Sequence, residues 1–442
     1  MKGRRIAAIF LCIVVCIFLQ AGCSNEEKEI RIILKTPPLT ISNGGASEIK
    51  ETYDLMARAG EDFEKQYDKN VNIEVIKFNY EDETRHIADC FDTEDATDIL
   101  FEGYFNMSSY IYTGRPVPLD GVLDEDVVKD FAENDYNAGK VEGRSYMLPY
   151  YSLQNTLVYN KQMFKQCGLD EYIAPDNEVA NWTLEEWDII LDTLAEKLPD
   201  MQYPMAMYAK DNQGDTHIMT LLRSRGCEFF DENNDFHVNC PEGIAALKWI
   251  QEGVDRNWYP EGVHNLSIND CMTLFYNNQL AICIANNASY SGYDRDKVGL
   301  VNFPSVDGNG LSTSFETGFM VFDNGDEEKL EVARDFLRYF YSQEEYLDFE
   351  AVGLPANKSV TEKMKDKIYM LDTYDANKVT NVDFTMNNPN WQGTETSVRS
   401  VFWPHIHDLL TGDITPEKCA EDIDRDCNRA IKTGREEGKL HK

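Results

Sequence analysis

Aromatic, amide, hydroxyl and carboxylate side chains recur in the segments that follow the predicted strands of this sequence. Ligands bind at such segments in open α/β sheets, because the segments lie beyond the carboxyl ends of the strands. Rings can stack on the C–H faces of a polyhydroxylated solute, while the polar groups bond its hydroxyls. The residues that predict this chemistry are Thr36, Glu102, Tyr104, Asn106, Tyr150, Tyr151, Gln154, Asn286, Tyr290, Glu316 and Trp391.

Charge within these segments favours a neutral ligand over an anion. A phosphate or sulfate group is normally bound by cations, and Lys35 is the one cation that these segments supply. Each candidate also has an ordinary interpretation. The aromatic rings could be core packing, and Glu102 and Glu316 could be solvated surface acids.

Two further motifs have the spacing of metal ligands but lack a second requirement. The acidic segment Asp231–Glu242 matches a calcium loop, yet Phe236 stands where the sharp turn needs glycine. A hairpin turn there explains the pattern better. His405 and His407 are two residues apart and therefore point in different directions on a helix. We predict no metal site and no cofactor.

Periodic apolar residues predict the elements that must position the candidate residues. Alternation predicts strands at 30–34 and 71–75, and apolar spacings of three and four predict a helix between them over 49–67. A strand at 98–101 and further helices, one of them starting at the capping box of Thr183 and Glu186, continue the series. Such alternation is typical of α/β proteins with a mainly parallel sheet. A length of 442 residues predicts two domains.

The N-terminus has the pattern of a secretory signal. Cations within residues 1–5 precede an apolar run over 6–19 that is short for a membrane span. Ala21-Gly22 before Cys23 resembles a bacterial lipobox. We therefore expect a signal peptide over 1–22, lipidation of Cys23 and a tether over 23–29, which would hold the protein on the extracellular side of the bacterial cytoplasmic membrane. A plain signal peptide is the alternative.

Charge and cysteine content exclude several classes of protein. The 78 acidic and 42 basic residues give a net charge of −36, which repels nucleic acids and anionic membranes. The eleven cysteines contain no CxxC pair, which argues against zinc fingers and thioredoxin-like sites. Cys227 with Cys240, or Cys271 with Cys283, could form disulfides in an exported protein, or all could be free thiols.

The order of short motifs resembles the family-1 extracellular solute-binding proteins, the maltose-binding-protein-like receptors of bacterial ABC importers. Asn286 and Asn287 stand where many members carry glycines, and Tyr290 stands near a usual Trp. The matching stretches are Gly143–Pro149, Leu157–Lys161, Trp182–Trp187, 275–284, 299–304, 317–341, 353–355 and 403–415.

This resemblance implies a two-lobed α/β fold of the type II periplasmic-binding-protein class, with the ligand cleft between the lobes. It places residues 30–140 and 286–345 in the N-terminal lobe and residues 141–285 and 346–442 in the C-terminal lobe. It also favours Tyr151 and Trp391 as stacking rings. The implied protein is a monomer that binds a carbohydrate without catalysis and delivers it to ABC permease subunits. A lipid-anchored glycoside hydrolase and a solute receptor for a membrane sensor kinase are the alternatives.

Overall fold

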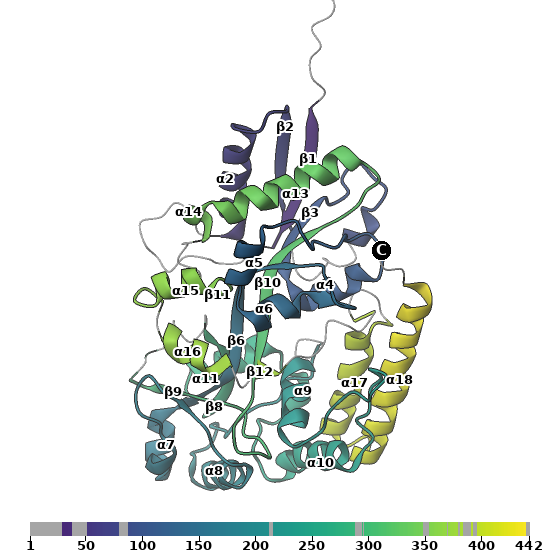
Figure 1. The fold of residues 1–442 in the computed structure, drawn as a ribbon. Coiled ribbons are helices and arrows are strands. Elements are labelled where there is room, and N and C mark those ends of the chain that lie inside the picture. The colour runs from purple at the N-terminus through teal and green to yellow at the C-terminus, as the bar shows by residue number, and fades with distance from the viewer. Residues whose placement is uncertain are drawn as a thin grey trace, which may run out of the picture.

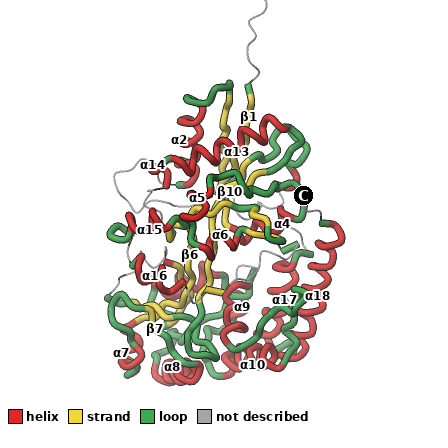
Figure 2. The backbone as a smooth tube through the Cα atoms, viewed as in Figure 1, coloured by secondary structure: helices red, strands yellow, loops and turns green. Residues whose placement is uncertain are grey.

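A long sheet flanked by helices organises the protein (Figure 2). The computed structural model describes residues 29–37, 51–78, 87–211, 215–287, 294, 296–347, 353–368, 370–378, 381–382, 390–391 and 396–438. The strands are β1 (Ile30–Thr36), β2 (Val71–Lys77), β3 (Ile99–Gly103), β4 (Lys140–Val141), β5 (Arg144–Ser145), β6 (Leu148–Asn160), β7 (Val179–Ala180), β8 (Ile282–Asn286), β9 (Val298–Val301), β10 (Ser312–Val321), β11 (Leu354–Pro355) and β12 (Asn381–Val382).

Helices cover both ends of the sheet (Figure 1). Those near β1 to β3 are α2 (Thr52–Glu64), α4 (Tyr104–Ile111), α5 (Glu125–Asp130), α6 (Glu133–Ala138), α13 (Glu327–Ser342) and α14 (Glu344–Leu347). The others are α7 (Lys161–Cys167), η1 (Asp170–Tyr172), α8 (Leu184–Lys197), α9 (Asp215–Ser224), α10 (Pro241–Asp255), η3 (Val263–Asn265), α11 (Ile268–Tyr276), α15 (Lys358–Met364), α16 (Leu371–Asn377), α17 (Val398–Thr411) and α18 (Pro416–Glu437).

The predicted strand–helix–strand unit at the start of the chain is confirmed. β1 and β2 pair in parallel, and α2 between them buries Leu55, Met56, Ala59 and Phe63 against the sheet. The capping box at Thr183 also forms, so that α8 begins where the sequence indicates. The α/β class follows from these elements.

The prediction of a mainly parallel sheet is wrong, because the sheet is mixed. β2, β1 and β3 run parallel, but β10 is antiparallel to β3 and to β6. β6 is in turn antiparallel to β8 and β9. Strand–helix alternation predicts parallel pairing within one crossover unit, whereas β6 and β10 pair across more than 150 residues of chain. Their direction was therefore not readable from local pattern.

Buried apolar side chains gather at the two ends of the sheet. One large cluster contains Leu157 of β6 and Phe303, together with the helices from α7 to α11 and from α15 to α18. Two clusters at the other end contain β1, β3 and α13, and reach Tyr151 of β6 and Phe319 of β10. We call the first region the lower half and the second the upper half. β6 and β10 run through the centre from one to the other (Figure 1). The predicted lobe boundaries stay a prediction.

Local structure also decides several smaller questions. The segment at Asp231 forms the hairpin turn that the sequence favoured, with Phe230 bridged to Phe236. The eight cysteines from Cys90 onward form no disulfide within the residues that the structure describes. Among the helices that the structure describes, none has the length and apolar content to cross a membrane. The predicted signal peptide and the lipidation site Cys23 lie outside the described residues.

Candidate functional site

Strands of both halves end at the middle of β6 and β10. The parallel strands β1, β2 and β3 all run toward this level, and the last residue of β3, Gly103, lies opposite Thr317 of β10. From the lower half, β8 ends opposite Asn155 of β6 and β9 ends opposite Leu157. The carboxyl ends of strands thus converge from two sides on residues 152–156 and 312–317, which we call the waist. Such convergence is where α/β sheets bind ligands.

The waist is buried and polar, unlike the cores on either side. Burying polar groups in a sheet costs free energy unless each finds a hydrogen-bond partner. A continuous band of them is therefore typical of a site that receives a polar molecule. None of its polar residues exposes more than 7 % of its surface; they are Ser152, Gln154, Asn155, Thr156, Ser312, Thr313, Ser314, Glu316 and Thr317.

Strand register places six buried polar side chains on one face of the sheet. Lys35 of β1 pairs with Leu100 of β3, and Glu102 lies two residues after Leu100 on β3. Glu102 lies opposite Gly318 of β10. Glu316, two residues before Gly318 on β10, lies opposite Ser152 of β6. Because side chains alternate between faces, these residues point the same way. With Ser314 opposite Gln154, the set is Lys35, Glu102, Glu316, Ser152, Ser314 and Gln154, which we call the polar row.

Three members of the polar row have no hydrogen-bond partner among the residues that the structure describes. They are the Lys35 ammonium and the hydroxyls of Ser152 and Ser314. Lys35 exposes 1 % of its surface and Ser152 none. A buried donor without a partner costs about 1–3 kcal/mol, and a charged one more. A bound molecule that offers oxygen acceptors would relieve this cost.

Amide side chains extend the polar row into the lower half. Asn377, at the end of α16, donates from Nδ2 to Gln154 Oε1 at 3.0 Å and to Asn302 Oδ1 at 2.9 Å. Asn302 donates in turn to Asn181 Oδ1 at 2.8 Å. The backbone N–H of Gln154 donates to Asn287 Oδ1 at 2.9 Å. These bonds hold the ends of β7, β8 and β9 and the last turn of α16 against the waist.

Two of the predicted aromatic residues lie within the upper core. Tyr150 packs against Phe101, with ring centroids 5.6 Å apart, and donates from its hydroxyl to the Tyr346 carbonyl at 2.6 Å. Tyr151 packs on Gly353, where an added Cβ would lie 2.1 Å from Cδ2 of the ring. Burial raises the pKa of Tyr151 to about 12. Both residues belong to β6. Their positions before polar residues in the sequence had suggested a loop instead.

The other predicted residues fall in three environments. Thr36 and Tyr104 lie at the carboxyl ends of β1 and β3, both buried, and the Thr36 hydroxyl donates to Thr52 Oγ1 at 3.0 Å. Asn286 ends β8 opposite Asn155. Trp391 lies in the lower core, where its ring stacks on Phe236 at 6.4 Å. Tyr290 and the side chain of Asn106 lie outside the described residues. All of these binding roles remain predictions.

The family model for bacterial extracellular solute-binding proteins matches residues 45–346. The chain belongs to this family. The predicted family and the two-lobed α/β fold are thereby confirmed, and members of the family are binding proteins.

Similar proteins agree with this assignment. The mannitol-binding protein of Pseudomonas aeruginosa is 26 % identical over 200 residues, which cover 44 % of this chain and 43 % of the relative. A putative binding protein of Brucella abortus is 22 % identical over 175 residues, 40 % of each chain. The chain thus aligns with about two fifths of the curated relatives' length. The GacH receptor of Streptomyces glaucescens shares the fold with a TM-score of 0.69 at 16 % identity, covering 92 % of this chain and 99 % of the receptor.

In addition to the polar row, this solute-binding protein has a buried polar pair that the sequence did not indicate. The His217 ring of α9 lies 4.8 Å from the Tyr208 ring and 5.6 Å from the ring of Phe303, which directly follows Asn302. Within the described ranges, neither ring nitrogen of His217 nor the Tyr208 hydroxyl has a hydrogen-bond partner. Burial lowers the pKa of His217 to about 3, so the ring is neutral. A lone histidine in a helix carries no spacing signal that would have found it.

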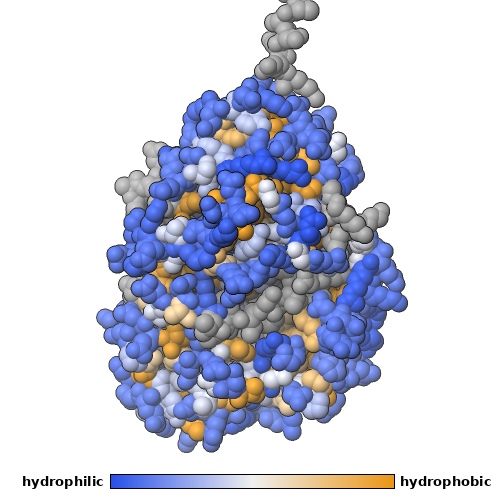
Figure 3. All heavy atoms as spheres, viewed as in Figure 1, coloured by the Kyte–Doolittle hydropathy of each residue, from blue (hydrophilic) through white to orange (hydrophobic). Residues whose placement is uncertain are grey.

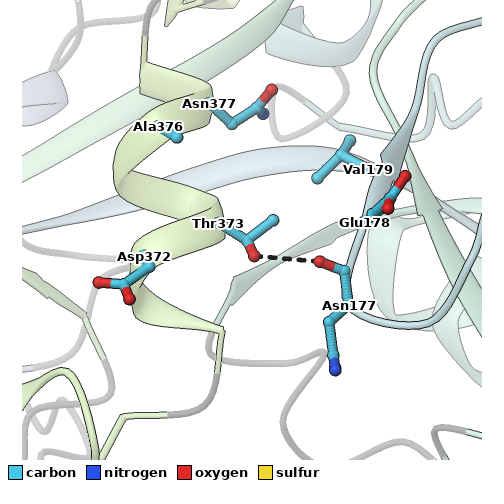
Figure 4. Close-up of a pocket in the computed structure, with 7 residues that line it drawn as sticks. All are labelled: Asn177, Glu178, Val179, Asp372, Thr373, Ala376 and Asn377. Atoms are coloured by element: carbon cyan, nitrogen blue, oxygen red, sulfur yellow. Dashed lines mark hydrogen bonds between the residues drawn. The ribbon is translucent and has the colours of Figure 1, made fainter.

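An open hollow of about 490 Å³ lies beside α16, between that helix and residues 177–179 (Figure 4). Asn377 lines it, and Thr373 Oγ1 donates across its floor to the Asn177 carbonyl at 3.0 Å. Glu178 and Asp372 on its rim are exposed. No group of three metal-ligating side chains occurs in the described parts of the chain. Hydrophilic residues cover most of the face in Figure 3, in keeping with the acidic composition.

Proposed function

We propose that this chain is a lipid-anchored receptor that binds a sugar or sugar alcohol between its two halves and delivers it to an ABC importer. The polar row carries the proposal, because it is a buried set of hydroxyl, amide and charged groups between two apolar cores. Relatives support the ligand class: one is named for mannitol, and GacH was solved in complex with acarbose. Both molecules are polyhydroxylated.

Closure of the two halves would complete the binding site. The strands β6 and β10 join the two halves. Because their middle sections are polar, neither apolar core extends through the waist. A solute that bonds groups from both sides would favour the closed arrangement by its differential affinity. Lys35, Ser152 and Ser314 would donate to solute oxygens, while Glu102 and Glu316 would accept from its hydroxyls. The importer would recognise the closed form.

We propose binding without catalysis, with glycoside hydrolysis as the second candidate. Glu102 and Glu316 lie on one face and are diagonal neighbours across β3 and β10, a relation that separates side chains by about 7–8 Å. That spacing falls in the range of the two carboxyl groups of inverting glycosidases, about 6.5–9.5 Å. Product formation must therefore be measured together with binding.

The test is a thermal-shift and turnover assay on residues 24–442. D-mannitol, maltose, acarbose and arabino-oligosaccharides are added in turn, and the products are analysed by chromatography. We expect stabilisation by at least one compound without cleavage. Glu316→Gln should weaken binding of that compound, whereas Asp372→Asn, in the surface hollow, should leave it unchanged. Stabilisation by none of these compounds would contradict the sugar proposal, and cleaved product would favour the hydrolase.

The location and the partner are inferred from the sequence. We propose lipidation at Cys23, a monomer in solution, and lobes formed by residues 30–140 with 286–345 and by 141–285 with 346–442. A membrane sensor kinase is the alternative partner. Pull-down of permease subunits from membranes by the ligand-loaded protein, with capture of a kinase as the contrary result, separates the two.

A further inference from the structure

Asp135 and Lys378 form a buried ion pair. Lys378 Nζ lies 3.2 Å from Asp135 Oδ2 and 3.5 Å from Asp375 Oδ1. The Asp135 side chain exposes 1 % and the Lys378 side chain 10 % of its surface. At this depth, solvent and salt screen the attraction far less than at the surface.

The two partners belong to different halves of the protein. Asp135 lies in α6, and Phe131 just before that helix belongs to the upper core. Lys378 directly follows α16, whose Leu371 and Tyr374 belong to the lower core. The ion pair is therefore a side-chain link between the halves, separate from the strands β6 and β10.

The free energy of the ion pair depends strongly on the positions of the two halves. Asp135 Oδ1 has no hydrogen-bond partner in the described part of the chain, and burial raises the pKa of Asp135 although Lys378 opposes this shift. A buried pair adds little net stability over apolar packing, but removing one partner leaves an uncompensated charge and is strongly destabilising. A movement that separates the partners has a similar cost unless water reaches both.

Lys378 of this ion pair is joined to the candidate site through the residue that precedes it. Asn377, the residue before Lys378, bonds both Gln154 of the polar row and Asn302, which follows β9. A displacement of the end of α16 would therefore change the ion pair and the floor of the waist together. In the structure, in which the pair is formed, Lys35 and Glu102 expose 1 % or less, so the polar row is closed to solvent.

We propose that the Asp135–Lys378 pair holds the two halves in the closed arrangement and thereby raises the affinity of the waist for its solute. The inference rests on the proposed closure of the two halves. It concerns regulation of that site and not the identity of the solute.

The test compares Asp135→Asn, Lys378→Met and the double variant in residues 24–442. Small-angle scattering of the ligand-free protein reports the arrangement of the halves without any solute, and calorimetry with D-mannitol and maltose reports affinity. Each single variant should increase the radius of gyration and weaken binding about tenfold or more. The double variant should recover part of the loss, because no charge then remains buried alone.

Lys329→Met is the matched control. Lys329 Nζ lies 3.3 Å from the buried Asp98, but α13 and β3 both belong to the upper half. This variant should lower the melting temperature and leave the radius of gyration and the affinity unchanged. Near-isosteric Asp135→Asn keeps the test decisive if Lys378→Met does not fold. An unchanged radius in Asp135→Asn, or tighter binding, would overturn the inference. If neither solute binds, scattering still decides it independently of the sugar proposal.

Discussion

Replacing Lys35 should change stability and affinity in opposite directions. Lys35 is 1 % exposed near the end of β1, and its ammonium has no hydrogen-bond partner among the described side chains and backbone. A buried charge without a partner is unfavourable, and well-packed apolar replacements of buried charges are neutral or stabilising by about 1–4 kcal/mol. Methionine has a similar length and no charge. We therefore expect Lys35→Met to raise the free energy of unfolding of the ligand-free protein by about 1–3 kcal/mol.

The same substitution should weaken solute binding. A hydrogen bond to a charged group contributes about 1.5–3 kcal/mol, which corresponds to a loss of about 10- to 100-fold in affinity. Urea denaturation of the ligand-free protein measures the first effect, and calorimetry with the compound that stabilises the wild type measures the second. Lys329→Met, which removes a paired lysine from the same half, should instead lower stability and leave affinity unchanged.

Two results would refute this reasoning about Lys35. A destabilised ligand-free variant would show that the ammonium has a partner in the empty protein. Unchanged affinity in a folded, stabilised variant would show that the ammonium does not contact the solute, and the polar row would then end at Glu102.

Trp391→Ala should lower the free energy of unfolding by about 3–5 kcal/mol in urea, because the ring fills the lower core; an affinity loss in the folded variant would show that the ring also contacts the solute. Burial holds the pKa of His217 at about 3 in the folded protein. As pH falls from about 6.5 toward 3, the histidine is therefore protonated in the unfolded chain but not in the folded protein. Stability should fall by up to about 1.4 kcal/mol per pH unit in that window, and His217→Phe should lose less than the wild type between pH 7 and pH 5. Cys23→Ser should move the protein from the membrane fraction into the medium, and retention on the membrane would contradict lipid anchoring.

Local pattern in the sequence predicted local structure well. Alternation at 30–34 and helical spacing over 49–67 predicted β1 and α2, since both signals depend on residues within a few positions of each other. The capping box at Thr183 predicted the start of α8 for the same reason. The family resemblance supplied the two-lobed fold, which no local pattern contains.

The waist was not predictable in the same way. The polar residues that follow Pro149 read as a loop, whereas they form the buried centre of β6. Only the pairing of Glu316 with Ser152 and of Ser314 with Gln154 places them on one face, and those partners are about 160 residues apart in the chain. Tyr150 stands among them in sequence, yet the bulge near Thr317 places its ring in the upper core. Long-range register, absent from local periodicity, decides which side chains share a face.

Polarity at the waist links the division of the protein to its binding site. If residues 152–156 and 312–317 were apolar, the cores around Tyr151 and Leu157 would join into one, and apolar burial would resist any relative movement of the halves. With polar side chains there, each half keeps its own core, and the groups left without partners bind best when a solute supplies their hydrogen bonds. The Asp135–Lys378 pair, which lies outside the waist, also affects the relative arrangement of the halves. It favours one arrangement without filling the space between the cores. Separation of the cores and the proposed affinity for a polyhydroxylated solute therefore have one physical origin, the polar middle of two strands.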